Sequence, residues 1–383
     1  MVNKSISNLH ISMTSFTHES RVLKEVNTII NHSNIQNVYI AALHENNLVE
    51  NEKISTGLFL KRFRLKTRFL PKSIVFQSFK YVELLFQVYF FYRNKNIKIL
   101  NIHTLALLPL GVFFKFLFNA RLVYDTHELE TETRNLRGVK KVLAKILERL
   151  FINYCDNIIC VNQSIADWYR KKYQLDYLPK IALNTPIFKD LKKKKDLFRQ
   201  EFNISEETTI FLYQGGFTTG RNIELLLEAF YKIKSSKSAI IFMGYGPLEE
   251  KVKRYAEKTS NIFFKPAVSQ ELLLDYTSSA DIGFVIIDKG SLNNLMSLPN
   301  KLFEYAMAGV GVIASDNIEI KKFVQNYDCG ICLEDVNSKS IINTIRLITD
   351  ESIKLFSINA LKMFKENNWS HQEKALIDIY KKI

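Results

Sequence analysis

The sequence predicts an α/β protein of two domains, each built on a parallel β-sheet with helices on both faces. The chain has 383 residues, more than the roughly 250–300 at which a single hydrophobic core usually stops growing. Strand-like and helical patterns alternate from end to end, as they do in doubly wound sheets. A charged, aperiodic stretch at residues 186–207 divides this alternation and predicts a hinge near residue 190. We expect domains at 1–187 and 188–365.

The first half is expected to form strands from short β-branched runs, and helices where apolar residues recur at three- and four-residue spacing. The expected strands are 8–13, 37–43, 97–103, 121–128 and 157–162. The expected helices are 20–33, 79–92, 105–118, 140–154 and 163–173. Residues 99–124 are apolar enough to resemble a membrane span. Because Asn101, Pro109 and Lys115 interrupt them, strand, helix and strand are expected instead.

The second half is expected to repeat the alternation and to end in a helical tail. The expected strands are 207–216, 238–246, 261–268 and 281–287. The expected helices are 222–234, 247–258 and 269–280. Four consecutive lysines at 192–195 are interpreted as part of a solvated linker, because runs of like charge rarely pack.

The stretch SLPNKLFEYAMAGVGVIASD, at 297–316, predicts a short helix, a glycine stop and a buried strand. Ser297 is expected to cap the helix, and Pro299 to lie in its first turn, where the missing N–H costs nothing. Gly309 suits the left-handed residue that ends a helix. Val310–Ala314 is an apolar run short enough for a strand buried on both faces.

Two charged residues of that helix, Lys301 and Glu304, are three apart and therefore lie on one side of it. One interpretation is a surface ion pair, which contributes about 0.5 kcal/mol at most. The other is a ligand site, because a helix N-terminus offers free N–H groups to a phosphate.

The composition indicates an anionic partner or substrate and an intracellular setting. The formal net charge is +14, which suits nucleic acid, the cytoplasmic face of a membrane or an anionic substrate. The cysteines are too few for a disulfide-built secreted fold, and without a nearby histidine they are expected in the core rather than at zinc. They are Cys155, Cys160, Cys329 and Cys332. The N-terminus lacks the apolar segment of a secretory signal, so a cytosolic protein is expected.

The segment KRFRLKTRFLPK, at 61–72, interleaves basic with apolar residues. Its basic residues are Lys61, Arg62, Arg64, Lys66, Arg68 and Lys72. Its apolar residues are Phe63, Leu65, Phe69 and Leu70. This pattern suits an anionic membrane surface, and it also suits nucleic acid. A solvated basic loop remains a third interpretation.

Two strand ends carry polar or glycine-rich turns of the kind that bind ligands in α/β sheets. After the strand at 207–216, Gly215 and Gly216 permit close backbone approach, and Arg221 precedes the next helix, which makes a phosphate cradle. MGYGP, with Gly244, forms a second glycine-rich turn between the next strand and helix. It lacks the third glycine of a dinucleotide-binding motif, so that motif is not predicted here. In the first half, His127 follows a strand within an Asp-Thr-His-Glu cluster; a structural turn is the alternative.

Four stretches, in their order and separations, resemble a bacterial family 4 glycosyltransferase of the GT-B fold. They are VYDTHELETETRN, YQGGFTTGRNIELLLEAF, FMGYGPLEE and SLPNKLFEYAMAGVGVIASD. The similarity covers nearly the whole chain and is strongest at 209–316. It implies two Rossmann-like, doubly wound parallel-sheet domains facing across a cleft, with a closing helix at 366–383 that packs back on the first domain. It also implies transfer of a sugar from a nucleotide-sugar to an acceptor, with retention and without a metal or cofactor.

The resemblance assigns roles in the second half. Glu304 matches a glutamate that accepts hydrogen bonds from the ribose hydroxyls, and Arg221 matches the cation that holds the donor diphosphate. Gly216 stands where many members carry a second arginine. Lys301, in the first turns of its helix, is our hypothesis for the replacement cation. The expected substrate-binding residues are Gly215, Gly216, Arg221, Gly244, Val268, Asn300, Lys301, Glu304 and His103.

The remaining assignments concern the sugars and the base. His127 matches a position close to the transferred sugar and, with Glu304, is expected to be catalytic; His103 has a weaker parallel. Val268 resembles the loop whose backbone reads the base, so uridine and guanosine both fit. Met296 stands where the family has a first glutamate, which often touches the donor sugar.

The resemblance also bears on the first helix, which carries Arg21 and Glu25 in its first turns. Polar groups there lie near the acceptor in the family, although a pairing on the helix surface is the simpler interpretation. The glycine-rich loop that usually precedes this helix is absent, because the first glycine is Gly57. Acceptor contacts are therefore not assigned.

The sequence predicts a glycosyltransferase that acts in bacterial surface-polysaccharide assembly, such as capsule or O-antigen. The expected partners are a UDP- or GDP-linked donor, a glycan or polyprenyl-lipid-linked acceptor and the anionic inner face of the cell membrane, with no nucleic acid. One alternative is a nucleotide-sugar epimerase of the same fold. The other is a non-enzymatic nucleic-acid-binding protein, which the +14 charge would explain.

Overall fold

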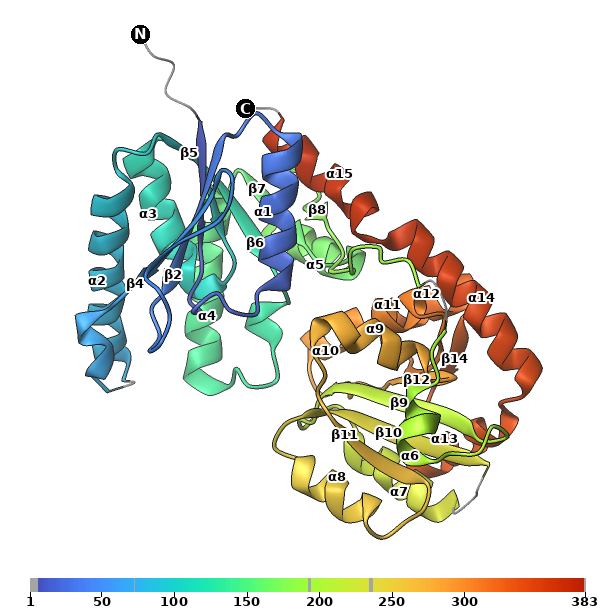
Figure 1. Ribbon diagram of the computed structural model, residues 1–383. Helices are drawn as coiled ribbons and strands as arrows, with labels where there is room; N and C mark the ends of the chain where they lie inside the picture. Colours follow the sequence, from blue (N-terminus) through green and yellow to red (C-terminus); the bar gives the residue numbers. More distant parts are fainter. Residues whose placement is uncertain (1–5, 72, 192–193, 234–236, 382–383) are drawn as a thin grey trace. The chain divides into compact units, whose positions relative to one another are not determined.

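The computed structural model describes residues 6–71, 73–191, 194–233 and 237–381. The chain forms two compact units (Figure 1): Met1–Ala182 with Glu373–Ile383 make up unit 1, and Leu183–Gln372 make up unit 2. Lys72 of the basic segment, and Lys192 and Lys193 of the lysine run, lie outside the described residues.

Unit 1 is built on one sheet, whose strand order over the described residues is β3-β4-β2-β1-β5-β6-β7-β8. The strands are β1 (Ser7–Ile11), β2 (Asn37–Leu43), β3 (Asn51–Ser55), β4 (Leu58–Phe63), β5 (Ile97–Ile102), β6 (Arg121–Thr126), β7 (Asn157–Cys160) and β8 (Lys180–Ile181). Neighbours are parallel except β3 and β4, which form an antiparallel hairpin. Strand β1 is buried along its whole length, so the centre of the sheet is covered on both faces.

Helices cover both faces of this sheet (Figure 1). They are α1 (Ser20–His32), α2 (Ile74–Tyr92), α3 (Leu108–Phe118), α4 (Gly138–Phe151), α5 (Gln163–Tyr173) and the end of α15 (Trp369–Tyr380). Short 3₁₀ turns are η1 (Lys66–Phe69), η2 (Leu105–Leu107), η3 (Glu130–Glu132) and η4 (Ile152–Tyr154). Helix α15 lies beside α1, where the Thr28 hydroxyl donates to Glu373 at 3.0 Å. Helices α2, α3 and α4 lie side by side on the other face.

The apolar stretch at 99–124 forms β5, α3 and β6, which confirms the expected strand, helix and strand. Among the described residues, no helix combines the length and the apolar character needed to cross a bilayer.

Part of the basic segment at 61–72 is structural, which corrects its interpretation as a membrane-binding or nucleic-acid-binding surface or a solvated loop for those residues. It begins inside β4, where Arg62 is buried and donates to Glu52 at 2.8 Å and to the carbonyl oxygen of Ser15 at 2.8 Å. Phe63 and Leu65 are also buried. The hairpin that places Arg62 turns at Gly57, where φ is +78° and a Cβ would lie 2.7 Å from the Gln36 carbonyl oxygen. A glycine is needed there.

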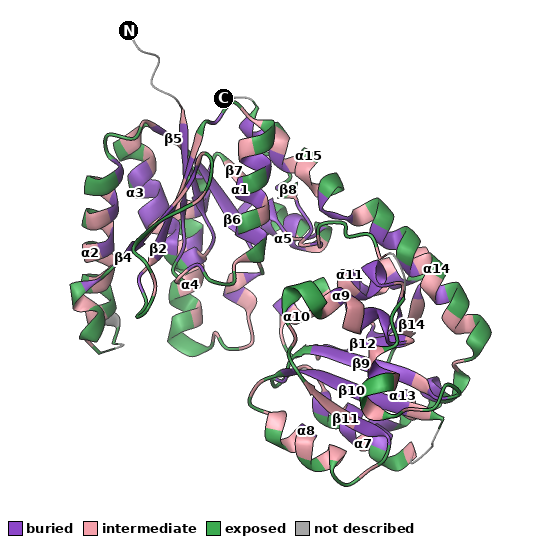
Figure 2. Cartoon of the chain, in the orientation of Figure 1, coloured by how far each residue is buried: buried purple, intermediate pink, exposed green. Residues whose placement is uncertain are grey.

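Unit 2 is built on a parallel sheet, with strand order β11-β10-β9-β12-β13-β14 over the described residues. The strands are β9 (Thr209–Gly216), β10 (Ser238–Tyr245), β11 (Ile262–Pro266), β12 (Ile282–Val285), β13 (Gly311–Ser315) and β14 (Gly330–Leu333). The helices are α6 (Leu197–Phe202), α7 (Ile223–Ile233), α8 (Glu249–Ala256), α9 (Gln270–Ser278), α10 (Leu292–Met296), α11 (Asn300–Met307), α12 (Ile318–Tyr327), α13 (Ser338–Leu347) and α14 (Asp350–Asn367). Figure 2 shows its buried strands between the helices.

The strand order of unit 2 reverses direction between β9 and β12. From β9 the chain moves to β10 and β11 on one side, and from β12 it moves to β13 and β14 on the other. Aromatic side chains of a buried cluster, including Phe211, Phe230 and Phe284, hold this centre together. In open parallel sheets, ligands bind at the carboxyl ends of the strands beside such a reversal.

The stretch at 297–316 forms the predicted helix, glycine stop and buried strand, but the cap differs. Helix α11 begins at Asn300, and Pro299 takes the position before it. The hydroxyl of Ser297 instead donates to the Asn294 carbonyl oxygen of the preceding short helix, at 2.8 Å. Gly309 has φ +66°, which confirms the predicted left-handed stop.

Two smaller predictions concern lysines and cysteines. Lys194 and Lys195 are exposed, as expected for a solvated stretch, and Lys195 pairs with Asp275 at 2.8 Å. Cys155, Cys160 and Cys329 are buried, as expected for core residues, whereas Cys332 is half-buried.

Candidate active site

Glycines at the carboxyl ends of β9 and β10 bring two backbones close together in unit 2. Gly215 pairs with Gly244 across the strands. A Cβ on Gly244 would overlap the Gly215 carbonyl oxygen, so this position requires glycine. Gly215 has φ +114° and is exposed, as is Gly216. The turn therefore presents backbone without side chains at the edge of the sheet where ligands are expected.

Lys301, on α11, reaches this glycine turn. Its Nζ lies 4.0 Å from the centre of the Tyr213 ring. A Cβ on Gly215 would lie 3.6 Å from the same nitrogen. Burial, together with the positive charge of Arg221, lowers the pKa of Lys301 to about 7. The structure thus brings Gly215, Lys301 and Arg221 to one place, where an added anion would relieve the repulsion between two cations.

The second charged residue of α11, Glu304, is held by a chain of hydrogen bonds. The Gln214 side-chain amide donates to Glu304 Oε2 at 2.6 Å, and the Thr277 hydroxyl donates to Gln214 Oε1 at 2.8 Å. The side chain of Glu304 is half-buried. Sequence reasoning missed Gln214, although a polar residue at the end of the apolar run before Gly215 is a usable signal.

Tyr305 fixes α11 against the sheet. Its buried hydroxyl accepts from the Gln214 backbone N–H at 3.0 Å and donates to the Leu212 carbonyl oxygen at 3.0 Å. The Tyr305 ring covers Gly283, where a Cβ would lie 2.6 Å from a ring carbon. The helix is therefore locked to both β9 and β12.

Two other expected residues of unit 2 lie on neighbouring loops. Val268 is half-buried between β11 and α9, and Asn300 is exposed as the first residue of α11.

In unit 1, Asp125 is the centre of a buried polar cluster at the end of β6. Arg21 Nη2 donates to its Oδ1 at 2.8 Å. His103 Nδ1 and His127 Nε2 lie 3.1 and 2.9 Å from its Oδ2. Burial alone would raise the pKa of Asp125, but Arg21, His127 and His103 together hold it well below its usual range. The carboxylate is ionised and accepts from all three residues.

This arrangement sets the orientation of His127, whose side chain is 35% exposed. Because the ionised Asp125 accepts its Nε2–H, the neutral ring keeps Nδ1 as an acceptor. His103 lies behind it, with the two rings 5.2 Å apart. The predicted pair His103 and His127 is thus brought together, and Asp125 connects them.

Arg21 and Glu25 lie inside unit 1, which corrects the interpretation of a pair on the helix surface. Arg21 Nε is 3.0 Å from Glu25 Oε1, and both side chains are buried. The Arg21 guanidinium also donates to the Ala182 carbonyl oxygen at 2.9 Å. Burial and the nearby Asp125 raise the pKa of Glu25, against the opposing effect of Arg21.

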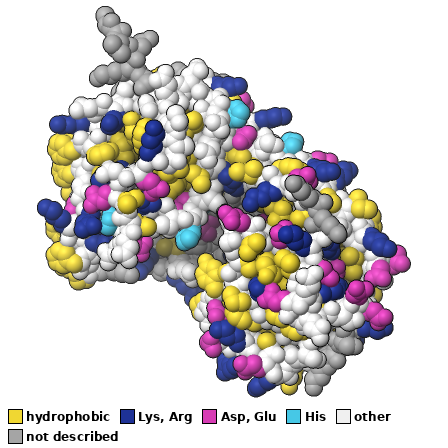
Figure 3. All heavy atoms as spheres, in the orientation of Figure 1, with side chains coloured by type: hydrophobic (Ala, Val, Ile, Leu, Met, Phe, Trp, Pro, Cys, Tyr) yellow, Lys and Arg dark blue, Asp and Glu magenta, His cyan; other side chains and the backbone are white. Residues whose placement is uncertain are grey.

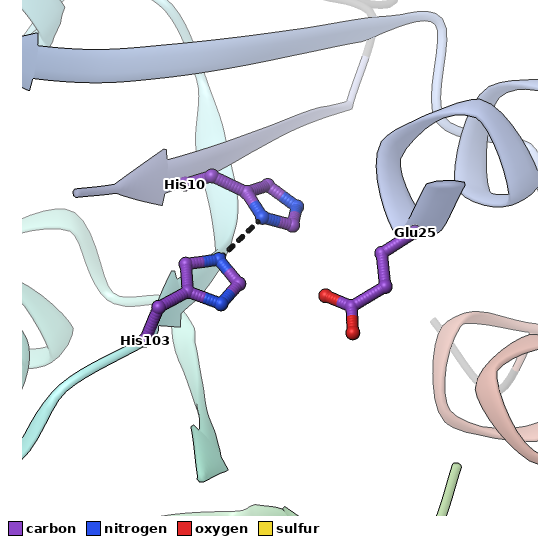
Figure 4. A group of neighbouring side chains, drawn as sticks. All are labelled: His10, Glu25 and His103. Atoms are coloured by element: carbon purple, nitrogen blue, oxygen red, sulfur yellow. Dashed lines mark hydrogen bonds between the residues drawn. The ribbon is translucent and has the colours of Figure 1, made fainter. Parts of the chain in front are cut away.

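His10, Glu25 and His103 form the inner layer of the cluster (Figure 4). His10 Nδ1 and His103 Nε2 are hydrogen-bonded at 2.9 Å. By residue type and spacing, this group and the group of His103, Asp125 and His127 could each hold a metal ion. However, the Arg21 guanidinium already supplies positive charge to both Asp125 and Glu25. The geometry therefore favours a hydrogen-bonded cluster that orients His127 over a metal centre.

Two family models match the chain in succession. One, described as "Glycosyltransferase Family 4", matches residues 36–179. The other, described as "Glycosyl transferases group 1", matches residues 194–369. The chain belongs to the group 1 and family 4 glycosyltransferases. Membership of these families favours a glycosyltransferase over the epimerase and nucleic-acid alternatives.

Similar proteins agree with this assignment. A lipopolysaccharide 1,2-N-acetylglucosaminetransferase of Salmonella typhimurium is 28% identical over 199 residues, covering 46% of this glycosyltransferase and 49% of that protein. The match thus spans about half the length of the curated relative. Sucrose-phosphate synthase from Thermosynechococcus elongatus superposes with a TM-score of 0.77 at 16% identity, covering 98% of both chains. Anabaena Alr3699/HepE, in complex with UDP and glucose, gives 0.73 at 12% identity, covering 97% of this chain and 98% of that one.

The structural matches confirm the predicted fold class. Both neighbours share with this glycosyltransferase the GT-B fold, with two Rossmann-like parallel-sheet units.

Proposed function

We propose that this glycosyltransferase transfers a sugar from a UDP-linked donor to a glycan or polyprenyl-lipid-linked acceptor, with retention and without a metal. The observation that carries the proposal is the convergence of Lys301 and Arg221 on the glycine turn at Gly215. The UDP bound to the Anabaena neighbour supports uridine, and the Salmonella relative supports lipopolysaccharide assembly. The reaction would take place at the cytoplasmic face of the cell membrane.

Lys301 and Arg221 would neutralise the diphosphate as it leaves. Negative charge grows on the leaving group in the transition state, and fixed cations with the free N–H groups of α11 stabilise it. The half-buried Glu304 would accept the ribose hydroxyls, because a carboxylate offers two acceptor oxygens to two O–H donors. Gln214 positions this carboxylate by donating to Oε2.

His127 would position the sugar or the acceptor hydroxyl, with its Nδ1 as a hydrogen-bond acceptor. Asp125 fixes that ring through Nε2, at 2.9 Å. Asp125 is in this view a positioning residue, and His103 and Arg21 keep it ionised.

Replacing Lys301 tests the diphosphate site. We expect Lys301→Ala to weaken UDP binding about 10- to 100-fold, because a contact to a charged group contributes about 1.5–3 kcal/mol. Gly216→Arg in the same chain should restore at least half of the lost free energy. A Cβ at 216 meets only Thr218 Cγ2 at 3.8 Å and Gly216 is exposed, so the backbone accepts a side chain there. Calorimetry with UDP, and with GDP and CMP for comparison, measures this.

The matched control is Lys232→Ala, which removes an exposed lysine of the same unit that pairs with Glu228. It should leave UDP affinity unchanged. Unchanged UDP binding by Lys301→Ala, or equal weakening by both variants, would contradict the assignment of Lys301.

The pH dependence of UDP binding is a separate prediction. With its pKa lowered to about 7, Lys301 is mostly neutral in the free enzyme at pH 8 and must take up a proton to meet a diphosphate. UDP affinity should therefore fall as pH rises above 7, by up to about tenfold per pH unit. The charged and titratable groups near the amine are Arg221, Glu304 and Tyr213.

Calorimetry between pH 7.5 and 8.5 checks this, because the terminal phosphate of UDP, with a second pKa of about 6, is almost fully ionised in that range. Lys301→Arg stays charged and should give a flat profile. A wild-type profile as flat as that of Lys301→Arg would show that the amine does not titrate there.

A further inference from the structure

Helix α4 of unit 1 turns its apolar side to solvent. Its exposed apolar residues are Val139, Val142, Leu143, Ile146 and Leu150. Because a helix turns about 100° per residue, these five positions form one stripe. Val139 is 74% and Leu150 62% exposed, at opposite ends of the helix. The stripe is therefore uncovered along the whole of α4.

The opposite side of α4 is anchored by a polar group. Of the residues of α4, all of which the structure describes, Glu148 alone is buried. Its carboxylate accepts from the hydroxyls of Tyr169 at 2.7 Å and Tyr173 at 2.5 Å, both on α5. The tertiary anchoring of α4 thus uses the side away from the apolar stripe, and the stripe is available for a partner.

Two neighbouring helices extend the apolar surface. Helix α2 exposes Phe79, Val82, Phe86 and Phe90, and α3 exposes Phe113, Phe116 and Leu117. The Tyr89 and Phe118 rings stack 5.9 Å apart between α2 and α3, and α3 packs against α4. We call these twelve residues of α2, α3 and α4 the three-helix face. Figure 3 shows hydrophobic and basic side chains together over this part of unit 1.

Basic residues border the three-helix face. Residues 134–149 contain six basic residues (Arg134, Arg137, Lys140, Lys141, Lys145 and Arg149) and one acidic residue, the buried Glu148. Lys141 and Lys145 each pair with Glu132 at 2.6 Å, on the side of α4 away from the apolar stripe. Lys140 and Arg149 are exposed and fall on either side of the apolar stripe. Immediately after α2, the Arg93 guanidinium lies 5.2 Å from the centre of the Phe90 ring.

Apolar side chains bordered by cations suit one partner best. A helix lying in a lipid interface buries its apolar face near the acyl chains and places Lys and Arg among the headgroups. A second copy of this chain would instead bring like charges together across the contact.

We propose that the three-helix face docks on an anionic lipid bilayer, with α4 lying in the interface. The biological role of this docking rests on the proposed function, because a polyprenyl-linked acceptor lies in a membrane and the enzyme must reach it there. We therefore assign the membrane contact to these helices and not to the basic segment at 61–72, where Arg62, Phe63 and Leu65 are buried.

Vesicle flotation tests the proposal with the whole chain, using phosphatidylcholine vesicles with and without phosphatidylglycerol. Wild type should float with the anionic vesicles at low salt and much less with the neutral ones. Val142→Gln/Ile146→Gln/Leu150→Gln should lower partitioning at least about tenfold. Lys140→Gln/Arg149→Gln should lower it about fivefold for each cation removed, and only on anionic vesicles.

The matched control is Leu347→Gln/Ile358→Gln, which replaces two residues of unit 2 that are 71% and 66% exposed. It should float like wild type. All variants should keep the UDP affinity of wild type, so failure to float leaves the proposed function standing, and failure to bind UDP leaves docking standing.

Three outcomes would overturn docking. One is no flotation of wild type on anionic vesicles at low salt. Another is equal flotation of wild type and the α4 apolar variant. The last is a concentration-dependent dimer of wild type, measured by light scattering, that the same variant abolishes while vesicles remain unbound.

Discussion

Glu304→Ala is expected to reduce kcat/KM for the UDP-sugar about 100- to 10,000-fold. Two hydrogen bonds from ribose hydroxyls to a carboxylate would be lost, and each contributes about 1.5–3 kcal/mol. The Gln214 amide, which donates to Glu304 Oε2 at 2.6 Å, would also lose its acceptor. Steady-state kinetics with UDP-sugars, together with calorimetry for UDP, measures the effect.

Glu304→Gln separates charge from shape, because it keeps the length of the side chain and one acceptor oxygen. It should recover part of the loss, since one ribose contact persists. Glu228→Ala is the control, because it removes an exposed glutamate from α7 that pairs with Lys232. Normal kinetics for Glu304→Ala would refute the ribose assignment.

Asp125→Ala is expected to lower the stability of unit 1 by about 3–5 kcal/mol, because it leaves the buried Arg21 guanidinium without its main partner. It should also lower kcat about 100-fold, since His127 would no longer be held in place. Thermal unfolding followed by circular dichroism measures the first effect, and turnover at a temperature where the variant is folded measures the second.

The variant Arg21→Met/Glu25→Gln/Asp125→Leu distinguishes structure from catalysis, because it also removes the charge of the buried Glu25, which lies 3.0 Å from Arg21. Replacing a buried ion pair by apolar residues often restores stability, so the melting temperature should rise above that of Asp125→Ala. Turnover should remain low, because His127 still lacks its acceptor. Recovery of activity along with stability would mean that Asp125 serves the fold alone.

Periodicity predicted most of the regular elements, because each buried strand or helix face leaves a local pattern. The β3 and β4 hairpin was missed for the same reason: β3 is an exposed edge strand with the sequence NEKIS and has no apolar alternation to detect. Arg62, on β4, looked like a surface cation. Its burial depends on Glu52 and on the Ser15 carbonyl oxygen, which the fold alone brings to it.

The residues of the candidate site likewise divide into those that a local sequence signal predicts and those that only the fold brings together. Gly215, Arg221 and Lys301 could be inferred from a glycine-rich strand end and from charge balance, which are local signals. The cluster around Asp125 could not, because Arg21 lies 104 residues away in the sequence. A single sequence does not show that a residue at the start of the first helix neutralises a carboxylate at the end of β6.

Helix α11 carries both Lys301 and Glu304, three residues and therefore about 4.5 Å apart along its axis. Tyr305 bonds the helix to β9 and fills the space above Gly283. The cation and the carboxylate are thus carried on one anchored helix before any nucleotide binds. We therefore expect a nucleoside monophosphate, which lacks the second phosphate, to bind more weakly than the diphosphate, without any side chain dedicated to exclusion.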